Sequence, residues 1–217
     1  MLNSQSATSA LLDLFRAERR TIRFRRRQLI FAEGTRSDSL YFIEQGGIKL
    51  TLTSPQGKEA VIATLRAGDF FGHEAFDVST PPRCANAVAL TNVQLAKIDH
   101  GLIIRVLNAR PSACLPIISH LARMVTHFEL QLAGNLVYRS DQRLARVLLL
   151  ISEIAGADAQ CRIPKLSQQE LAEMIGTTRQ RVNAILQRFK KLGLIEDSHA
   201  LQVCDSLRRF IDLEREF

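Results

Sequence analysis

The sequence lacks the features of membrane and secreted proteins. Its longest apolar run, Val147 to Ile151, is far shorter than the roughly 18 apolar residues that a membrane-spanning helix needs. The stretch Met1 to Ala10 is polar, contains no basic residue and has no apolar core, so it does not resemble a signal peptide. We therefore expect a cytoplasmic protein that makes no membrane contact.

Cysteine is scarce, and its four positions are scattered along the chain. Cys84, Cys114, Cys161 and Cys204 form no Cys-x-x-Cys pair, and none has a histidine at zinc-finger spacing. An iron–sulfur cluster needs clustered thiolates, which this pattern does not offer. A disulfide scaffold does not suit this length and cysteine density. We interpret the four as reduced thiols and expect no metal, no iron–sulfur cluster and no other cofactor.

Acidic residues are absent from one basic stretch near the C-terminus. The formal net charge of the chain is +7, which suits a polyanionic partner. Between Gly176 and Gly193 all the charged residues are basic, namely Arg179, Arg181, Arg188, Lys190 and Lys191. A second cluster of arginines lies between Arg16 and Arg27. For that cluster we favour a solvated β-face over a DNA or polymerase contact, and both remain open.

Regularly spaced glycines predict a β-roll in the N-terminal half. Gly46, Gly57 and Gly68 are eleven residues apart, and short strands with turn signals at 8–12-residue spacing are typical of a sandwich or barrel. The stretch Pro55 to Lys58 has the composition of a hairpin turn. Strand-like stretches lie between and beside these turns, at residues 22–25, 40–43, 48–53, 60–65 and 93–98.

A long helix is predicted after residue 110. Pro111 suits the first turn of a helix. Apolar residues then recur at spacings of three and four over about two heptads, at Ile118, Leu121, Val125, Phe128 and Leu132. Such a seam is typical of helices that pack along one another. A stripe of this length fits both packing on its own domain and packing on a partner helix.

A second domain is expected to begin at Arg139, after a break in the helical pattern. Ser140 or Asp141 could cap the next helix. Beyond it, Ser167 and Glu170 form a Ser-x-x-Glu capping box ahead of a short apolar helix that ends at Gly176. A Thr-x-x-Gln box from Thr177 then predicts another helix. Its apolar residues have the i, i+3, i+4, i+7 spacing: Val182, Ile185, Leu186 and Phe189.

These two capped helices, joined by a short glycine turn, predict a helix-turn-helix. A recognition helix presents its N-terminal residues to base edges in the major groove, where arginine can bind guanine and glutamine or asparagine can bind adenine. Residues 192–203 then predict a β-hairpin, or wing. A helical hairpin used only for packing is the alternative. The candidate DNA-binding residues are Ser167, Gln168, Thr177, Thr178, Arg179, Gln180, Arg181, Asn183 and Gln187.

Over nearly its whole length the sequence resembles the CRP/FNR family of dimeric transcription regulators. Gly34, Gly46, Gly57, the run Gly68 to Gly72, and Arg83 match the family's β-roll, and residues 166–195 match its reading head. The resemblance implies an α+β protein with an N-terminal double-stranded β-helix (jelly-roll) of the cyclic-nucleotide-binding type at 1–110. A dimerisation helix at 111–137 and a winged helix-turn-helix at 139–217 would follow. The seam named above would be the dimer interface.

The effector pocket departs from the pattern of the cAMP-binding members. There a Gly-Glu pair and an Arg-Ser pair hold the ribose and the cyclic phosphate. Gly72 and Arg83 keep this spacing, but His73 replaces the glutamate and Cys84 replaces the serine. Glu74 comes one place late, where strand geometry would turn it to the other face unless the turn is remodelled.

The long helix departs from the pattern as well, because Phe128 and Glu129 stand where small hydroxyl residues usually meet the adenine. The candidate effector residues are therefore Gly72, His73, Glu74, Arg83, Cys84, Phe128 and Glu129. Loss of the polar contacts predicts that cAMP does not bind as it does in the relatives. Arg83 favours another small anionic effector, and a protein active without ligand is the second possibility.

Two other classes of function compete with a transcription regulator. A cupin-like metalloenzyme would need clustered histidine and carboxylate ligands. The five histidines form no His-x-His pair, and only His73 lies in the body of the roll, so we expect no enzyme. A module that docks to a protein would not need an arginine-tipped recognition helix. The expected partners are a palindromic double-stranded DNA operator, a second copy of the chain, RNA polymerase and an unidentified effector.

Overall fold

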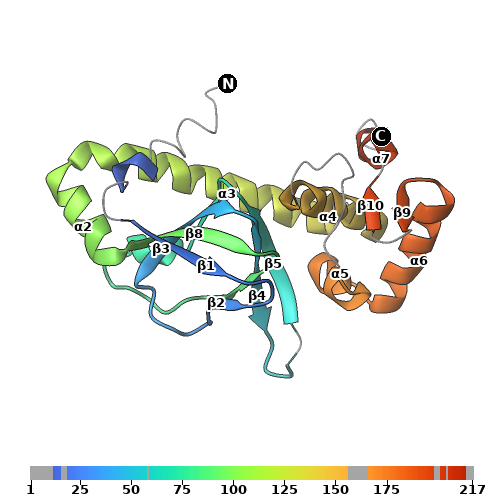
Figure 1. The fold of residues 1–217 in the computed structure, drawn as a ribbon, viewed down its shortest axis with the longest axis horizontal. Coiled ribbons are helices and arrows are strands. Elements are labelled where there is room, and N and C mark those ends of the chain that lie inside the picture. Colours follow the sequence, from blue (N-terminus) through green and yellow to red (C-terminus); the bar gives the residue numbers. More distant parts are fainter. Residues whose placement is uncertain are drawn as a thin grey trace. The chain divides into compact units, whose positions relative to one another are not determined.

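The computed structural model describes residues 12–15, 19–57, 59–155, 166–197, 201–203 and 205–213. The chain divides into two compact units, one comprising residues 1–52 and 63–132 and the other residues 53–62 and 133–217. Figure 1 shows the course of the chain through its strands and helices. Within the described ranges, no helix is both long enough and apolar enough to cross a membrane.

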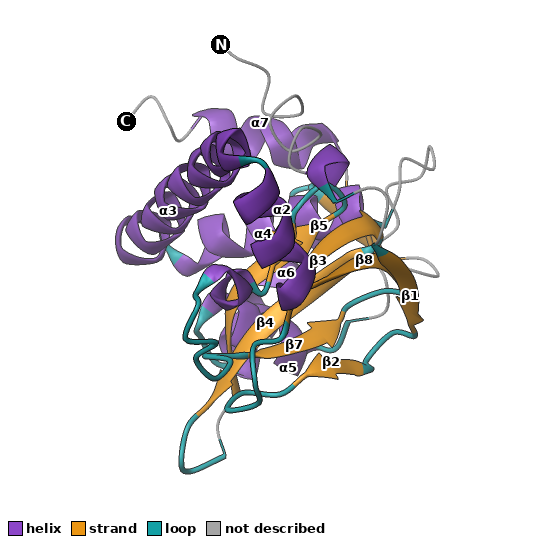
Figure 2. Ribbon diagram, turned by 90° about the vertical axis from the view of Figure 1, so that its left-hand side faces the viewer, coloured by secondary structure: helices purple, strands orange, loops and turns teal. Residues whose placement is uncertain are grey.

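The β-roll consists of two four-stranded sheets, which confirms the predicted jelly-roll. One sheet has the strand order β1-β8-β3-β6 and the other β2-β7-β4-β5 (Figure 2). The pairings β1–β8, β3–β8, β3–β6, β2–β7 and β4–β7 are antiparallel. The strands are β1 Arg20–Phe24, β2 Leu29–Phe31, β3 Ser39–Gln45, β4 Gly47–Thr53, β5 Glu59–Arg66, β6 Phe70–Phe71, β7 Asn86–Ala89 and β8 Val93–Asp99.

The sequence pattern explains these strands. Gly46, Gly57 and Gly68 all have positive φ, which allows the chain to reverse between consecutive strands. Inward-facing residues of both sheets then fill a common core, in which the rings of Phe31, Tyr41 and Phe71 pack against one another. All five stretches predicted as strands lie within or overlap observed strands.

Helices follow the roll, and one of them was not predicted. The helix α2, His100–Ala109, buries Leu102 and Ile103 in a second apolar cluster with Phe15. A short 3-10 helix, η2, Pro111–Ala113, precedes the long helix α3, Cys114–Val137. The sequence pattern did not predict α2, because its buried face is completed by residues from elsewhere in its unit. The expected long helix is confirmed, with proline in its preceding turn.

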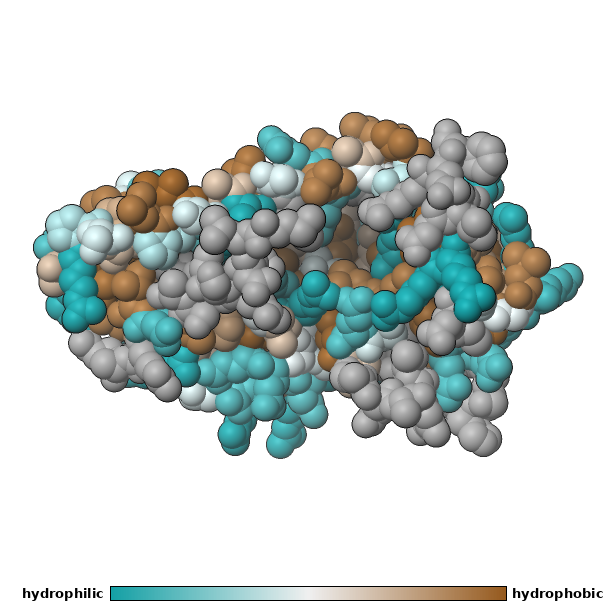
Figure 3. Space-filling model, turned by 90° about the horizontal axis from the view of Figure 1, so that it is seen from above, coloured by the Kyte–Doolittle hydropathy of each residue, from teal (hydrophilic) through white to brown (hydrophobic). Residues whose placement is uncertain are grey.

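The predicted seam on α3 faces two ways. Ile118, Val125 and Leu132, seven residues apart, are 59%, 56% and 62% exposed. Leu121 instead packs against the apolar cluster of α2, and Phe128 packs against the core of the roll. Hydrophobic residues reach the surface in Figure 3, in keeping with these exposures. The seam therefore holds α3 to its own unit through two residues and leaves three exposed.

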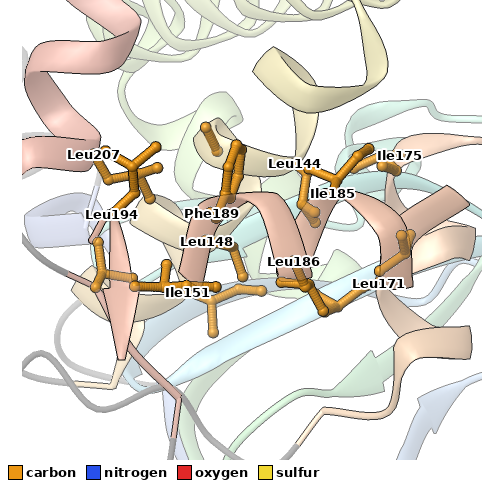
Figure 4. Packing of buried hydrophobic residues seen from close by; sticks show 14 of the residues in the cluster. Leu144, Leu148, Ile151, Leu171, Ile175, Ile185, Leu186, Phe189, Leu194 and Leu207 are labelled. Atoms are coloured by element: carbon orange, nitrogen blue, oxygen red, sulfur yellow. The ribbon is translucent and has the colours of Figure 1, made fainter. Parts of the chain in front are cut away.

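The second unit is a small helical domain with a two-stranded sheet. Its elements are α4 Ser140–Ile154, α5 Gln168–Ile175, α6 Arg179–Lys191, β9 Ile195–Asp197, β10 Leu201–Val203 and α7 Asp205–Leu213. β9 and β10 pair antiparallel, which confirms the predicted hairpin. Its core joins Leu148 of α4, Leu171 of α5, Phe189 of α6 and Leu207 of α7 (Figure 4). The sequence pattern did not predict α7.

Candidate functional site

The caps of α5 and α6 position the candidate recognition helix. Ser167 Oγ accepts a hydrogen bond from the Glu170 backbone N–H (3.1 Å), and the Glu170 carboxylate accepts one from the Ser167 N–H (2.7 Å), as the predicted capping box requires. Gly176 ends α5 with φ of 62°. The second predicted box was wrong by one residue. Thr178, and not Thr177, is the N-cap of α6, and its hydroxyl accepts from the Arg181 N–H (3.2 Å).

One face of α6 is buried and the other is open. Val182, Ile185, Leu186 and Phe189 are buried in the core of the unit. The predicted residues Thr178, Arg179, Gln180, Arg181, Asn183 and Gln187 are exposed. The arginines at the N-terminal end of α6 therefore lie where free N–H groups and the helix dipole attract anions.

Two polar contacts tie α6 to its neighbours. Gln168 Nε2 donates to Asn183 Oδ1 (3.1 Å), so the start of α5 and the middle of α6 are joined by candidate DNA-binding residues. Arg188 Nη1 donates to the Asp141 carboxylate (3.2 Å), which also binds Arg139 (3.1 Å). Burial raises the pKa of Asp141, but its hydrogen bond and ion pair with Arg139 bring the pKa below its usual value. No local pattern in the sequence indicates this long-range pair.

In the β-roll, the candidate effector pocket is built around a buried arginine. The Arg83 side chain is 1% exposed. Its guanidinium lies over the ring of Phe31, with 4.3 Å from Cζ to the ring centroid, and 5.8 Å from that of Tyr41. Its Nη2 donates a short hydrogen bond to the Ser39 carbonyl. Ser39, Phe31 and Tyr41 were not among the predicted residues, because they precede Arg83 by about forty residues or more and carry no motif.

Another nitrogen of that guanidinium, Nη1, meets an acidic partner within the roll, whereas its buried Nε has no hydrogen-bond partner among the described residues. Arg83 Nη1 donates to Glu74 Oε2 (3.1 Å) in an ion pair. The Cys84 thiol and backbone N–H donate to Glu74 Oε1, at 3.0 Å and 3.5 Å. Four of the predicted effector residues (Gly72, Glu74, Arg83 and Cys84) are thereby brought together.

A remodelled turn accounts for the position of Glu74. Residues His73–Phe76 form the 3-10 helix η1 with Gly72 as its N-cap, so strand alternation does not apply to Glu74. The exception named for Glu74, a remodelled turn, is therefore the case that the structure shows. Gly72 has φ of 78°, and a Cβ there would lie 2.6 Å from Arg83 Nη1. Only glycine fits this approach without a shift of the arginine.

The charges of this cluster favour an ionised glutamate and a protonated thiol. Burial raises the pKa of Glu74, but the hydrogen bond from Cys84 and the charge of Arg83 contribute to a net pKa below the usual value. Burial and the Glu74 carboxylate raise the pKa of Cys84 to about 11. At neutral pH the Cys84 thiol therefore stays protonated and donates a hydrogen bond to the Glu74 carboxylate.

The other candidate effector residues lie on η1 and α3, and the charge of His73 contributes to the lowered pKa of Glu74. His73 is half-buried and Glu129 is exposed on α3. Phe128 packs against the apolar core of the roll. His120, which was not predicted, is buried on α3 with its ring edge on Phe70, and burial lowers its pKa to about 4. In the part of the chain that is described, no group of three or more metal-ligating side chains is found.

Comparison with known proteins identifies both units. Residues 21–110 match the cyclic nucleotide-binding domain family, and residues 142–208 match the Crp-like helix-turn-helix domain family. A CRP-like cAMP-activated global transcriptional regulator of Mycobacterium tuberculosis is 28% identical over 190 residues, which cover 85% of this chain and 84% of that protein. The cAMP-activated global transcriptional regulator CRP of Salmonella typhimurium is 23% identical, over 90% of this chain and 94% of its own length.

Solved structures share the fold. FixK2 from Bradyrhizobium japonicum matches 90% of this chain and 96% of its own with a TM-score of 0.76 at 17% identity. A CRP/FNR-family transcriptional regulator from Thermus thermophilus matches 89% of this chain and 98% of its own with a TM-score of 0.73 at 22% identity.

Proposed function

Because the chain belongs to the CRP/FNR family of transcription regulators, we propose that it binds a palindromic DNA operator as a homodimer, with α6 in the major groove. Domains at 1–110, 111–137 and 139–217 would serve effector control, dimerisation and DNA binding. The curated relatives are transcription regulators and not enzymes. We propose no catalytic activity for this chain.

The exposed face of α6 is the observation that carries the proposal. Thr178 caps the helix, and the side chain of the next residue, Arg179, is exposed. An arginine here can bind guanine O6 and N7 through two hydrogen bonds, and Gln180 can bind adenine in the same way. Ser167, Gln168 and Thr177, near the starts of the two helices, are the proposed phosphate contacts.

The exposed stripe of α3 supports the dimer. Ile118, Val125 and Leu132 repeat every seven residues, so they occupy one position of the heptad along which two parallel helices pack. Exposed leucine, isoleucine and valine at this density are costly in water and mark an interaction surface. A two-fold dimer would place two recognition helices about 34 Å apart, one helical turn of DNA.

The role of the β-roll has two possible forms. A small effector could bind in the pocket around Arg83 and change the DNA affinity of the dimer, with RNA polymerase as the further partner. The second form is a dimer that is active without a ligand. The relatives named above are described as cAMP-activated, but this chain carries His73 and Cys84 at the two positions that differ from their pattern.

Selection of DNA from a random library by the purified protein tests the function. We expect an enriched palindrome with half-sites about ten base pairs apart, bound by a dimer. Sedimentation of the protein alone and with the selected DNA gives the stoichiometry. No enrichment over the input library, or a protein that remains a monomer at micromolar concentration with and without DNA, would contradict the proposal.

A further inference from the structure

The pocket around Arg83 already contains an anion, which is the carboxylate of Glu74. Three donors from two adjacent residues meet it, namely Arg83 Nη1 (3.1 Å), the Cys84 thiol (3.0 Å) and, at longer range, the Cys84 backbone N–H (3.5 Å). A guanidinium, a side-chain donor and a backbone N–H that bind the two oxygens of one carboxylate form an anion-binding arrangement.

Arg83 has little freedom to serve another anion at the same time. Its side chain is 1% exposed, its second terminal nitrogen donates to the Ser39 carbonyl, and its guanidinium lies over the ring of Phe31. A buried guanidinium requires a compensating negative charge, and Glu74 supplies it. The Glu74 side chain is itself only 13% exposed, so the pair is largely withdrawn from water.

By the resemblance to the cAMP-binding members, Arg83 and Cys84 stand where the cyclic phosphate is held. We propose that Glu74 determines the ligand specificity of this pocket, because its carboxylate occupies the anion position and excludes cyclic nucleotides and other phosphates. This proposal deepens the proposed control of DNA binding by the β-roll and rests on it. Of the two forms of control described above, it favours a dimer that is active without an anionic effector.

Electrostatics gives the exclusion its physical basis. A phosphate that approaches Arg83 meets a carboxylate of like charge and must displace it from three donors. Displacement would move an ionised group whose pKa lies below its usual value, so protonation does not relieve the repulsion at neutral pH. Phe128 adds a second obstacle, since it packs against the core of the roll where α3 meets it.

Binding of cAMP and of inorganic phosphate to the full-length dimer tests the proposal by calorimetry. Glu74→Ala removes the internal anion, and Glu44→Ala is the matched control. Glu44 is also an ion-paired glutamate of the roll, 16% exposed, but its partners are Arg19 and Gln94. We expect Glu74→Ala to bind at least one of the two probes about tenfold or more tighter than the wild type, whereas Glu44→Ala does not.

The reactivity of Cys84 provides an independent measure that does not require a ligand. Glu74→Gln keeps the size of the side chain and removes its charge, so a larger fraction of Cys84 should ionise at pH 8. We expect iodoacetamide to alkylate Cys84 about three- to tenfold faster in Glu74→Gln than in the wild type. Peptide mass spectrometry measures the rate of alkylation. Cys114, which is exposed, serves as the internal reference. Thermal unfolding of each variant verifies that it is folded.

Either of two results would overturn the proposal. One is a wild type that binds cAMP or phosphate as tightly as Glu74→Ala does, which includes the case in which neither binds. The other is an unchanged rate of Cys84 alkylation in Glu74→Gln. Both measurements are made without DNA, so they are distinct from a failure of the proposed function, which would appear as no enriched operator in the selection.

Discussion

Substitution of Arg179 by alanine tests the proposed readout of DNA most directly. The structure predicts that this change leaves the helix intact, because Thr178 provides the cap of α6 and the buried face begins at Val182. The Arg179 side chain is exposed, so its removal creates no cavity. Any loss of DNA binding would therefore report a lost contact with DNA and not a lost fold.

The expected magnitude follows from the contact that an exposed arginine makes. A bidentate pair with guanine contributes about 1–3 kcal/mol of discrimination, which is about a 5- to 150-fold loss of affinity for the selected operator. Random DNA should lose much less, since one phosphate contact at most is removed and the slope of log K against log salt falls by about 0.9 or less. The ratio of specific to random affinity should therefore drop.

Arg188→Ala is the matched control on the same helix. Arg188 lies in the last turn of α6 and binds the Asp141 carboxylate, so it should not contribute to the choice of base. Fluorescence anisotropy with the selected operator and with scrambled DNA, over a range of salt concentrations, measures both variants. Equal losses on operator and scrambled DNA in Arg179→Ala, or a changed ratio in Arg188→Ala alone, would refute the assignment.

Three further changes test the packing, the dimer and the buried ion pair. Phe189→Ala removes a fully buried ring in contact with Phe210 and should destabilise the DNA-binding unit by about 3–5 kcal/mol in chemical denaturation, whereas less than about 1 kcal/mol would show a site that repacks. Val125→Glu places a charge in the exposed stripe of α3 and should shift the sedimenting species from dimer to monomer; an unchanged dimer would exclude this stripe as the interface. The pKa of Asp141 is lowered in the folded chain, so its stabilising effect is present above the unfolded pKa of about 3.9 and is lost as the pH falls through the folded value. Asp141→Asn should therefore weaken the loss of stability below about pH 4, and a denaturation profile with the wild-type pH dependence would contradict this.

Elements whose signals are local were predicted well from the sequence. The three glycines at eleven-residue spacing lie where the chain reverses between strands. Both hydrogen bonds of the predicted Ser167 capping box are present. The apolar spacing of α6 also identified its buried face. Each of these features depends on residues within one turn or one helix face, so the sequence alone contains the information.

Contacts between distant parts of the chain could not be read in this way. The pairing of Asp141 with Arg188 joins residues 47 positions apart, and Ser39 meets Arg83 across 44 positions. The short helices were missed for a related reason, because α2 and α7 acquire their buried faces from residues elsewhere in their units. The shift of the α6 cap from Thr177 to Thr178 reflects two adjacent threonines that both offer a hydroxyl.

The position of Glu74 shows how one local difference in backbone structure changes the interpretation of the pocket around Arg83. Gly72 and Arg83, which match the family pattern, predicted a site that binds an anionic ligand. The sequence could not show that η1 begins directly after Gly72, and a 3-10 turn in place of a strand brings the carboxylate back to Arg83. A buried arginine needs a negative partner. Where the chain itself provides that partner, the arginine can be retained for the stability of the roll and need not indicate a phosphate ligand.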